Sequence, residues 1–170
     1  MKNEQNAMRE IKIEKLILNI GGTGDNLEKG FKLLGIISGR KPMKRKSKKR
    51  IPSFGIRPGM EVGCIVTIRK NPEELIDRLL QSRDRKMKKK SVAVNHLTFG
   101  IKEYIEVPGM EYQRDIGIIG LEATAVFVRK GRRIANRKLK KAHIPKRQDV
   151  SKEEIIKFME QKFKVEFIGK

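Results

Sequence analysis

The sequence has few of the residues that mark disulfide frameworks or stacking surfaces. It contains one cysteine, Cys64, so an intrachain disulfide is excluded, and it contains no tryptophan. A lone cysteine fits a reducing compartment, and we expect an intracellular protein. Aromatic residues make up only 5% of the chain. This scarcity argues against a protein that stacks successive unpaired bases on a row of rings.

Long apolar runs are also missing. No stretch approaches the roughly 18 consecutive apolar residues that a membrane-spanning helix needs. Residues 1–10 are polar, without the apolar centre of a signal peptide. The 170 residues suit one compact domain. We therefore predict a single cytoplasmic domain over residues 1–170. It has a polar tail at about 1–8, an exposed basic loop at about 44–59 and a C-terminal helix at about 151–163.

The spacings typical of metal and catalytic sites are absent as well. His96 and His143 lie far apart, and no C-x-x-C or H-x-x-x-H spacing occurs. The glycine-rich turn at residues 21–24 lies between a predicted strand and a predicted helix, where phosphates are often held. It matches neither the dinucleotide fingerprint nor the P-loop, so a tight structural turn is the simpler interpretation. We expect no enzyme, no metal and no cofactor.

Acidic residues are scarce relative to basic ones. The chain has 20 acidic residues against 41 lysines and arginines, which gives a net charge of +21. An excess of this size repels itself in the compact state and persists where a polyanion neutralises it. Nucleic acid is the first candidate partner, and an anionic membrane surface is the second.

Stretches rich in apolar residues or alternating between apolar and polar residues, bounded by turn residues, predict the strands. They are expected at about residues 11–20, 62–68, 99–107 and 118–128. In the second strand, the apolar phase consists of Val62, Cys64, Val66 and Ile68 and would face the core. Cys64 is then a small core residue rather than a reactive thiol.

Capping residues predict three helices. Asp25 is expected to cap a helix that ends at Gly39, and a second helix starts at Asn71-Pro72. Ser151 and Glu154 form a capping box before the third. Helices interspersed with strands that have short connections predict an α+β fold. We expect a largely antiparallel sheet with helices packed on one face and basic loops around it. The other face of the sheet would remain free.

The basic residues are gathered in three tracts. Residues 40–50, 83–90 and 129–141 together hold 22 of the 41 lysines and arginines. Each tract follows a predicted core element, so we expect the tracts to form surface loops that contact RNA phosphates. Phe54 and Ile56 lie between basic flanks in the first loop region, which favours contact with a partner.

A known family resembles this sequence in several segments. They include MREIKIEKLILNIG, GDNLEKGFKLLGIISGRKP, PSFGIRPGMEVGCIVTIR, DIGIIGLEATAVFVRKG and VSKEEIIKFMEQKF, and they run in order from about Met8 to the C-terminus. In these motifs the chain resembles the universal large-subunit ribosomal protein that binds 5S ribosomal RNA. This family is called L5 in bacteria and L11 in eukaryotes.

The resemblance implies a structural constituent of the large ribosomal subunit. Its implied place is the central protuberance, bound to 5S rRNA and large-subunit rRNA beside another 5S-binding ribosomal protein. It would also contact a small-subunit protein across a bridge and approach the P-site tRNA. The implied location is the cytoplasmic ribosome, with a nucleolar stage during assembly if the source is a eukaryote.

The resemblance and the basic tracts together give the candidate site residues. Family positions for RNA contact fall on Asn19, Arg40, Phe54, Arg57 and Thr67. From the charge and strand patterns we add Lys41, Arg69, Arg132 and Arg133 as RNA-binding residues. Thr67 and Arg69 occupy the strand phase opposite the apolar one and would face the free side of the sheet. The loop that approaches tRNA or the small subunit would use Lys44, Arg45, Lys46, Lys48, Lys49 and Arg50.

Two other classes of function remain open on the sequence. A free RNA chaperone would bind several unrelated RNAs with similar affinity. A membrane-surface protein would need an apolar face opposite a basic one, and none of the basic tracts shows it.

Overall fold

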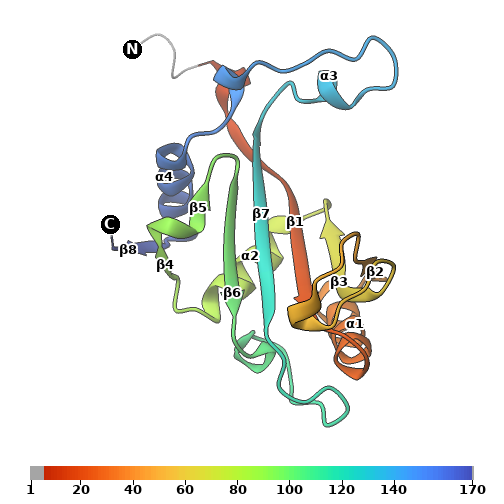
Figure 1. The fold of residues 1–170 in the computed structure, drawn as a ribbon. Coiled ribbons are helices and arrows are strands. Elements are labelled where there is room, and N and C mark those ends of the chain that lie inside the picture. Colours follow the sequence, from red (N-terminus) through yellow and green to blue (C-terminus); the bar gives the residue numbers. More distant parts are fainter. Residues whose placement is uncertain (1–5, 170) are drawn as a thin grey trace.

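An antiparallel sheet of six strands forms the centre of the fold, in the spatial order β2-β3-β1-β7-β6-β5 (Figure 1). The computed structural model describes residues 6–169, so most of the predicted polar tail lies outside the described residues. The strands of this sheet are β1 (Ile11–Gly21), β2 (Met43–Lys46), β3 (Glu61–Ile68), β5 (Val92–Ala93), β6 (His96–Ile101) and β7 (Leu121–Arg129). The predicted α+β class with a largely antiparallel sheet is confirmed.

Within residues 6–169, the three longest helices pack on one face of this sheet and contribute to one core. They are α1 (Asp25–Ser38), α2 (Pro72–Gln81) and α4 (Lys152–Phe163). Their stops and starts follow the sequence signals: α1 ends at left-handed Gly39, and Pro72 is the first residue of α2. Ser151 caps α4 and forms the predicted capping box with Glu154 of its first turn. A further helix, α3 (Arg133–Asn136), lies in the last basic tract.

The core lies between the helices and the apolar phase of the strands. Leu16, Leu18 and Ile20 of β1 are buried there, and so are Cys64, Val66 and Ile68 of β3. Cys64 is fully buried, which confirms its place in the core, and this burial raises the pKa of its thiol. Helix α1 approaches the sheet closely at Gly30, where a Cβ would lie 2.9 Å from Ile20 Cγ2. A residue with a side chain at position 30 would therefore require Ile20 or helix α1 to shift.

Three predicted element bounds were wrong. The strand expected at about 118–128 is β7, which begins at Leu121 and ends at Arg129. The strand expected at 99–107 is β6, which begins at His96 and ends at Ile101. After Ile101 the chain leaves the sheet and forms a 3-10 turn (Tyr104–Glu106). Tyr104 and Val107, three residues apart, are both buried at this turn. Helix α1 is capped by Gly24 instead of Asp25, which is the first helical residue and makes no capping bond.

The basic tract at 83–90 is not the free loop that we expected. It contains β4 (Lys86–Lys88), which pairs in parallel with β8 (Glu166–Ile168) near the C-terminus. Arg85 donates to Asp77 at 2.9 Å and to the carbonyl of Phe163 at 2.8 Å. Part of this tract therefore links the C-terminal segment to α2 and does not form a free basic loop.

Candidate nucleic-acid interface

The face of the sheet opposite the helices carries a row of polar side chains across neighbouring strands. Thr67 of β3 lies opposite Ile17 of β1, which lies opposite Thr124 of β7, which in turn lies opposite Thr98 of β6. The hydroxyl oxygens of Thr98 and Thr124 are 3.0 Å apart and share a hydrogen bond. The predicted outward orientation of Thr67 is thus confirmed by its register. The row presents hydroxyl groups on a half-buried, helix-free surface.

A second row of this face contains Asn19. Its register partners are Ile65 on β3 and Glu122 on β7. The Asn19 side-chain amide donates to the Glu122 carboxylate at 3.4 Å, which leaves its carbonyl oxygen available as an acceptor. Ile17 and Ile65 are half-buried beside these polar groups, so the surface is mixed in character.

Arg69 does not lie on the sheet as we predicted. Strand β3 ends at Ile68, and Arg69 follows it as an exposed residue. Arg40 and Lys41 are exposed just after the end of α1. Arg40 lines a small pocket of about 260 Å³ together with Lys70 and Arg78, close to that end of β3. These cations therefore cluster at one border of the sheet.

The first basic loop is partly a strand. Residues Met43–Lys46 form the edge strand β2, so the predicted loop at 44–59 is shorter than we expected. Lys44 forms ion pairs with Glu28 of α1 and, at 3.5 Å, with Glu61 of β3. The hydrogen bond that Lys44 donates to the Glu28 carboxylate raises the pKa of Lys44. Lys44 is consequently tied to the body of the protein, in contrast to its predicted role as a free loop cation.

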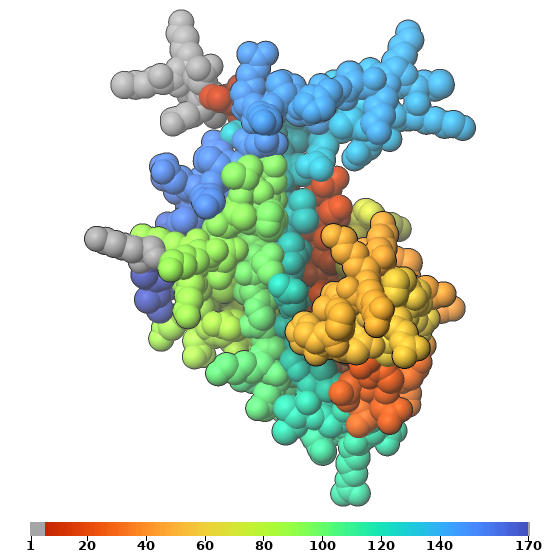
Figure 2. Space-filling model, in the orientation of Figure 1, coloured from red at the N-terminus to blue at the C-terminus, as the bar shows by residue number. Residues whose placement is uncertain are grey.

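Beyond β2 the chain forms a tight projection, the tip loop, at residues 47–60. Its neck is closed by two backbone hydrogen bonds of Ser47, which accepts from Gly59 at 2.9 Å and donates to Met60 at 2.8 Å. Phe54 is 77% exposed at its far end. The remaining predicted cations of this region are all exposed: Arg45, Lys46, Lys48, Lys49, Arg50 and Arg57. Figure 2 shows this region (orange to yellow) as a raised mass beside the strip of β1 and β7.

The third basic tract forms a protruding arm at residues 130–149, on which α3 is drawn in Figure 1. Arg132 Nε lies 3.7 Å from the Glu14 carboxylate of β1, while Arg133 is exposed. Lys130 pairs with Glu10 and thereby lowers the pKa of that carboxyl. The predicted RNA residues thus occupy the sheet face, the tip loop and the arm, and they do not converge on one point (Figure 2).

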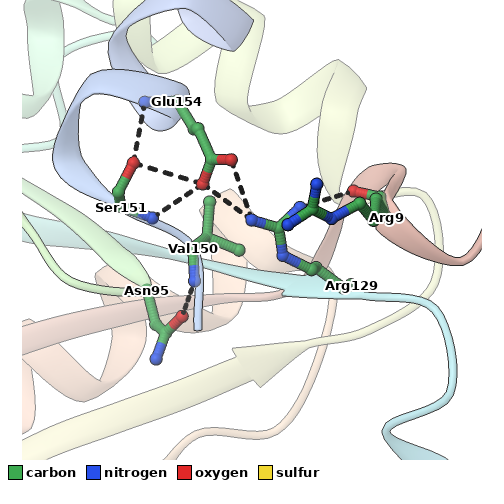
Figure 3. Close-up of polar contacts among 6 residues, drawn as sticks. All are labelled: Arg9, Asn95, Arg129, Val150, Ser151 and Glu154. Atoms are coloured by element: carbon green, nitrogen blue, oxygen red, sulfur yellow. Dashed lines mark hydrogen bonds and ion pairs between the residues drawn. The ribbon is translucent and has the colours of Figure 1, made fainter. Parts of the chain in front are cut away.

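An ion pair that sequence reasoning missed secures the base of the arm. Arg129, whose side chain is 10% exposed, donates through Nη2 to both carboxylate oxygens of Glu154 at 2.8 Å (Figure 3). It also donates to the Arg9 carbonyl at 2.9 Å. The signal was available, because Arg129 occupies the same strand phase as buried Ala125 and Phe127.

Asn95 fixes the other end of the arm. Its side-chain amide donates to Asp149 at 2.9 Å. Its side-chain oxygen accepts from the backbone N–H of Val150 at 2.7 Å (Figure 3). The arm therefore leaves the sheet at Arg129 and returns beside the β5–β6 turn.

The described residues, 6–169, contain no group of three or more histidine, cysteine or acidic side chains placed to hold a metal ion. None of the helices formed by these residues is both long and apolar enough to cross a membrane.

Comparison with known proteins matches nearly the whole chain. Residues 6–57 match the family model described as ribosomal protein L5, and residues 61–163 match the model for the C-terminus of that ribosomal family. The chain is 40% identical over 168 residues to large ribosomal subunit protein uL5 of Nanoarchaeum equitans, covering 96% of this chain and 99% of that protein. The protein of the same name from Sulfurisphaera tokodaii is 39% identical over 168 residues, covering 96% and 95%. That from Picrophilus torridus is 38% identical over 174 residues, covering 99% of each.

Proposed function

The chain belongs to the ribosomal protein L5 family, and we propose that it joins 5S rRNA to large-subunit rRNA in the large ribosomal subunit. Family membership makes it a ribosomal protein that acts as a structural component of the cytoplasmic ribosome, and not as an enzyme.

The observation that carries the proposal is the free face of the sheet. It presents the hydroxyls of Thr67, Thr98 and Thr124 and the amide of Asn19 on adjacent strands. Folded RNA is recognised largely by its shape, through contacts to 2′-hydroxyls and phosphates. Hydroxyl and amide groups suit the first kind of contact. The exposed arginines and lysines of the tip loop and the arm suit the second.

The two projections supply separate roles in this proposal. The arm, with Arg132 and Arg133, contacts rRNA phosphates together with the sheet. The tip loop, with Phe54 at its end, reaches toward the P-site tRNA and the small-subunit protein. Arg40, Lys41 and Arg69 extend the rRNA surface at the border of the sheet.

Sucrose-gradient sedimentation and a competition assay test the proposal together. The protein should migrate with large-subunit particles, and purified protein should prefer 5S rRNA over an unrelated folded RNA of equal length at moderate salt. Equal competition by the two RNAs would favour a general RNA chaperone. Absence from large-subunit particles would contradict the ribosomal assignment.

A further inference from the structure

A cavity of about 470 Å³ opens between the end of β7, the β5–β6 turn and the arm. Val128 lines this cavity and is only 3% exposed, although it belongs to the outward phase of β7. The arm folds back over this residue and is held there by the bonds of Asn95 to Asp149 and Val150. The cavity therefore lies at the end of the sheet, between the sheet and the arm.

The lining of the cavity has an aliphatic part and a polar part. Val128, Ala135, Ala142 and Ile144 form the aliphatic part. The polar part includes Asn136, Lys141, His143 and Gln148, whose side chains make no hydrogen bond or ion pair with any residue between 6 and 169. Asn95 and Asp149, in contrast, are bonded to each other. Donors and acceptors that make no bond within the described residues thus line a cavity that also has an aliphatic part.

The charge of the cavity favours an anionic ligand. Arg132 and Lys141 lie on its lining, and among residues 6–169 the counter-charge of Arg132 is the Glu14 carboxylate, 3.7 Å from its Nε. Asp149 is the single acid among the lining residues, and the Asn95 amide satisfies one of its oxygens. The volume falls within the roughly 300–1,000 Å³ of pockets that enclose small ligands.

We propose that this cavity receives one unstacked nucleotide of ribosomal RNA. The base lies against the aliphatic wall, its edge bonds to Asn136, His143 and Gln148, and its phosphate binds Arg132 and Lys141. Sequence-specific recognition of RNA takes unstacked bases from loops and bulges, which need such a pocket. The inference rests on the proposed ribosomal function and adds to it a base-specific contact away from the row of threonines.

The test uses a substitution that fills the cavity and measures the reactivity of the RNA nucleotides. Particles are reconstituted with wild-type protein, with Ala142→Trp, or with Leu139→Trp. Leu139 is 78% exposed on the same arm and does not line the cavity, so its variant controls for added bulk. The double variant His143→Ala with Gln148→Ala removes edge contacts without adding bulk. Acylation of RNA 2′-hydroxyls then reports which nucleotides each protein protects.

Among the nucleotides that the wild-type protein protects, one outside the RNA helices should depend on the cavity. It should become reactive with Ala142→Trp and with the double alanine variant but stay protected with Leu139→Trp. Its position tells whether 5S rRNA or large-subunit rRNA supplies it. Identical protection by all four proteins would overturn the inference while 5S binding stood. A photo-crosslink from position 143 to a protein instead of RNA would also overturn it. Failure of the wild-type protein to enter particles would instead contradict the proposed function.

Discussion

The Arg129 guanidinium and the Glu154 carboxylate form an ion pair that joins the end of β7 to the first turn of α4. The same guanidinium binds the Arg9 carbonyl, so three segments of the chain meet at one side chain. Because Arg129 is almost fully buried, its charge depends on the Glu154 carboxylate for compensation. Two predictions follow from this dependence.

The substitution Glu154→Gln should destabilise the protein by about 2 kcal/mol, since it leaves a buried guanidinium without its counter-charge. The figure is kept below the cost for a fully buried pair because Glu154 itself is 40% exposed. Urea unfolding followed by circular dichroism measures the change. Glu153→Gln, in the same helical turn but exposed, is the matched control and should change the free energy of unfolding by less than about 0.5 kcal/mol. Equal losses in both variants would contradict a special role for the pair.

Acid should weaken the same link. Burial raises the pKa of the Glu154 carboxyl, but hydrogen bonds from Ser151 and Arg129 lower it more, so the pKa lies below 4.5. A carboxyl whose pKa is lower in the folded state stabilises the protein above its unfolded pKa and loses that effect as pH falls through the folded value. The stability difference between wild type and Glu154→Gln should therefore shrink below pH 4.5. Unfolding curves from about pH 6 to about pH 3 measure it. A difference that stayed constant over this range would contradict the assignment.

The substitution Thr67→Glu should lower the affinity for 5S rRNA roughly tenfold or more, because it places a carboxylate where phosphate approaches. The fold should persist, since Thr67 lies on the face opposite the core. Filter binding together with circular dichroism measures both. Gln161→Glu adds the same charge on an exposed position of α4 and should bind normally. Unchanged affinity in a folded Thr67→Glu protein would remove Thr67 from the interface.

Removal of the tip loop should separate binding of 5S rRNA from retention of P-site tRNA. Deletion of Lys46 to Gly55 is expected to spare 5S binding and impair translating ribosomes. The closed neck at Ser47 allows a cleaner version, in which residues 48–58 become a short glycine-containing turn that leaves β2 intact. We expect nearly unchanged 5S affinity and weaker retention of P-site tRNA. The reverse outcome, lost 5S affinity with normal tRNA retention, would exchange the assigned roles.

Salt should weaken RNA binding steeply, because each neutralised phosphate releases condensed counterion. With about six to ten phosphate contacts, affinity should fall roughly a thousandfold from 50 to 200 mM salt. Replacing Arg132 and Arg133 with alanine should flatten the log–log slope by up to about two units. Lys162→Ala is the control, since Lys162 pairs with Glu73 away from the arm. A slope that did not change in the double variant would exclude phosphate contacts by these arginines.

Local patterns predicted the features that depend on local geometry. The outward orientation of Thr67, the buried phase of Cys64 and the capping box of Ser151 follow from periods of two residues or one helical turn, which a sequence displays directly. The strand expected at 99–107 was wrong beyond Ile101, where the chain leaves the sheet and turns around Tyr104. The apolar residues of this segment suggested a strand but did not reveal the turn.

Contacts between distant segments were not predictable in the same way. We assigned Arg129 and Lys44 to basic tracts, yet each is held by a carboxylate from another element, Glu154 and Glu28 respectively. Charge counting treats all cations alike, whereas only the fold decides which of them meet an acid. The cavity under the arm depends on Asn95 and Asp149, which are 54 residues apart.

The two edge strands of the sheet have a consequence for the protein before it meets RNA. At one edge stands β5, only two residues long, and at the other stands β2, in which three of four residues are basic. Short or positively charged edges resist pairing with the strand of another molecule. The long strand β1 pairs with β7 along most of its length and with β3 from Leu16 to Gly21, so its apolar second half lies inside the sheet. Pairing between the sheet edges of two copies is therefore disfavoured while the protein is free of RNA.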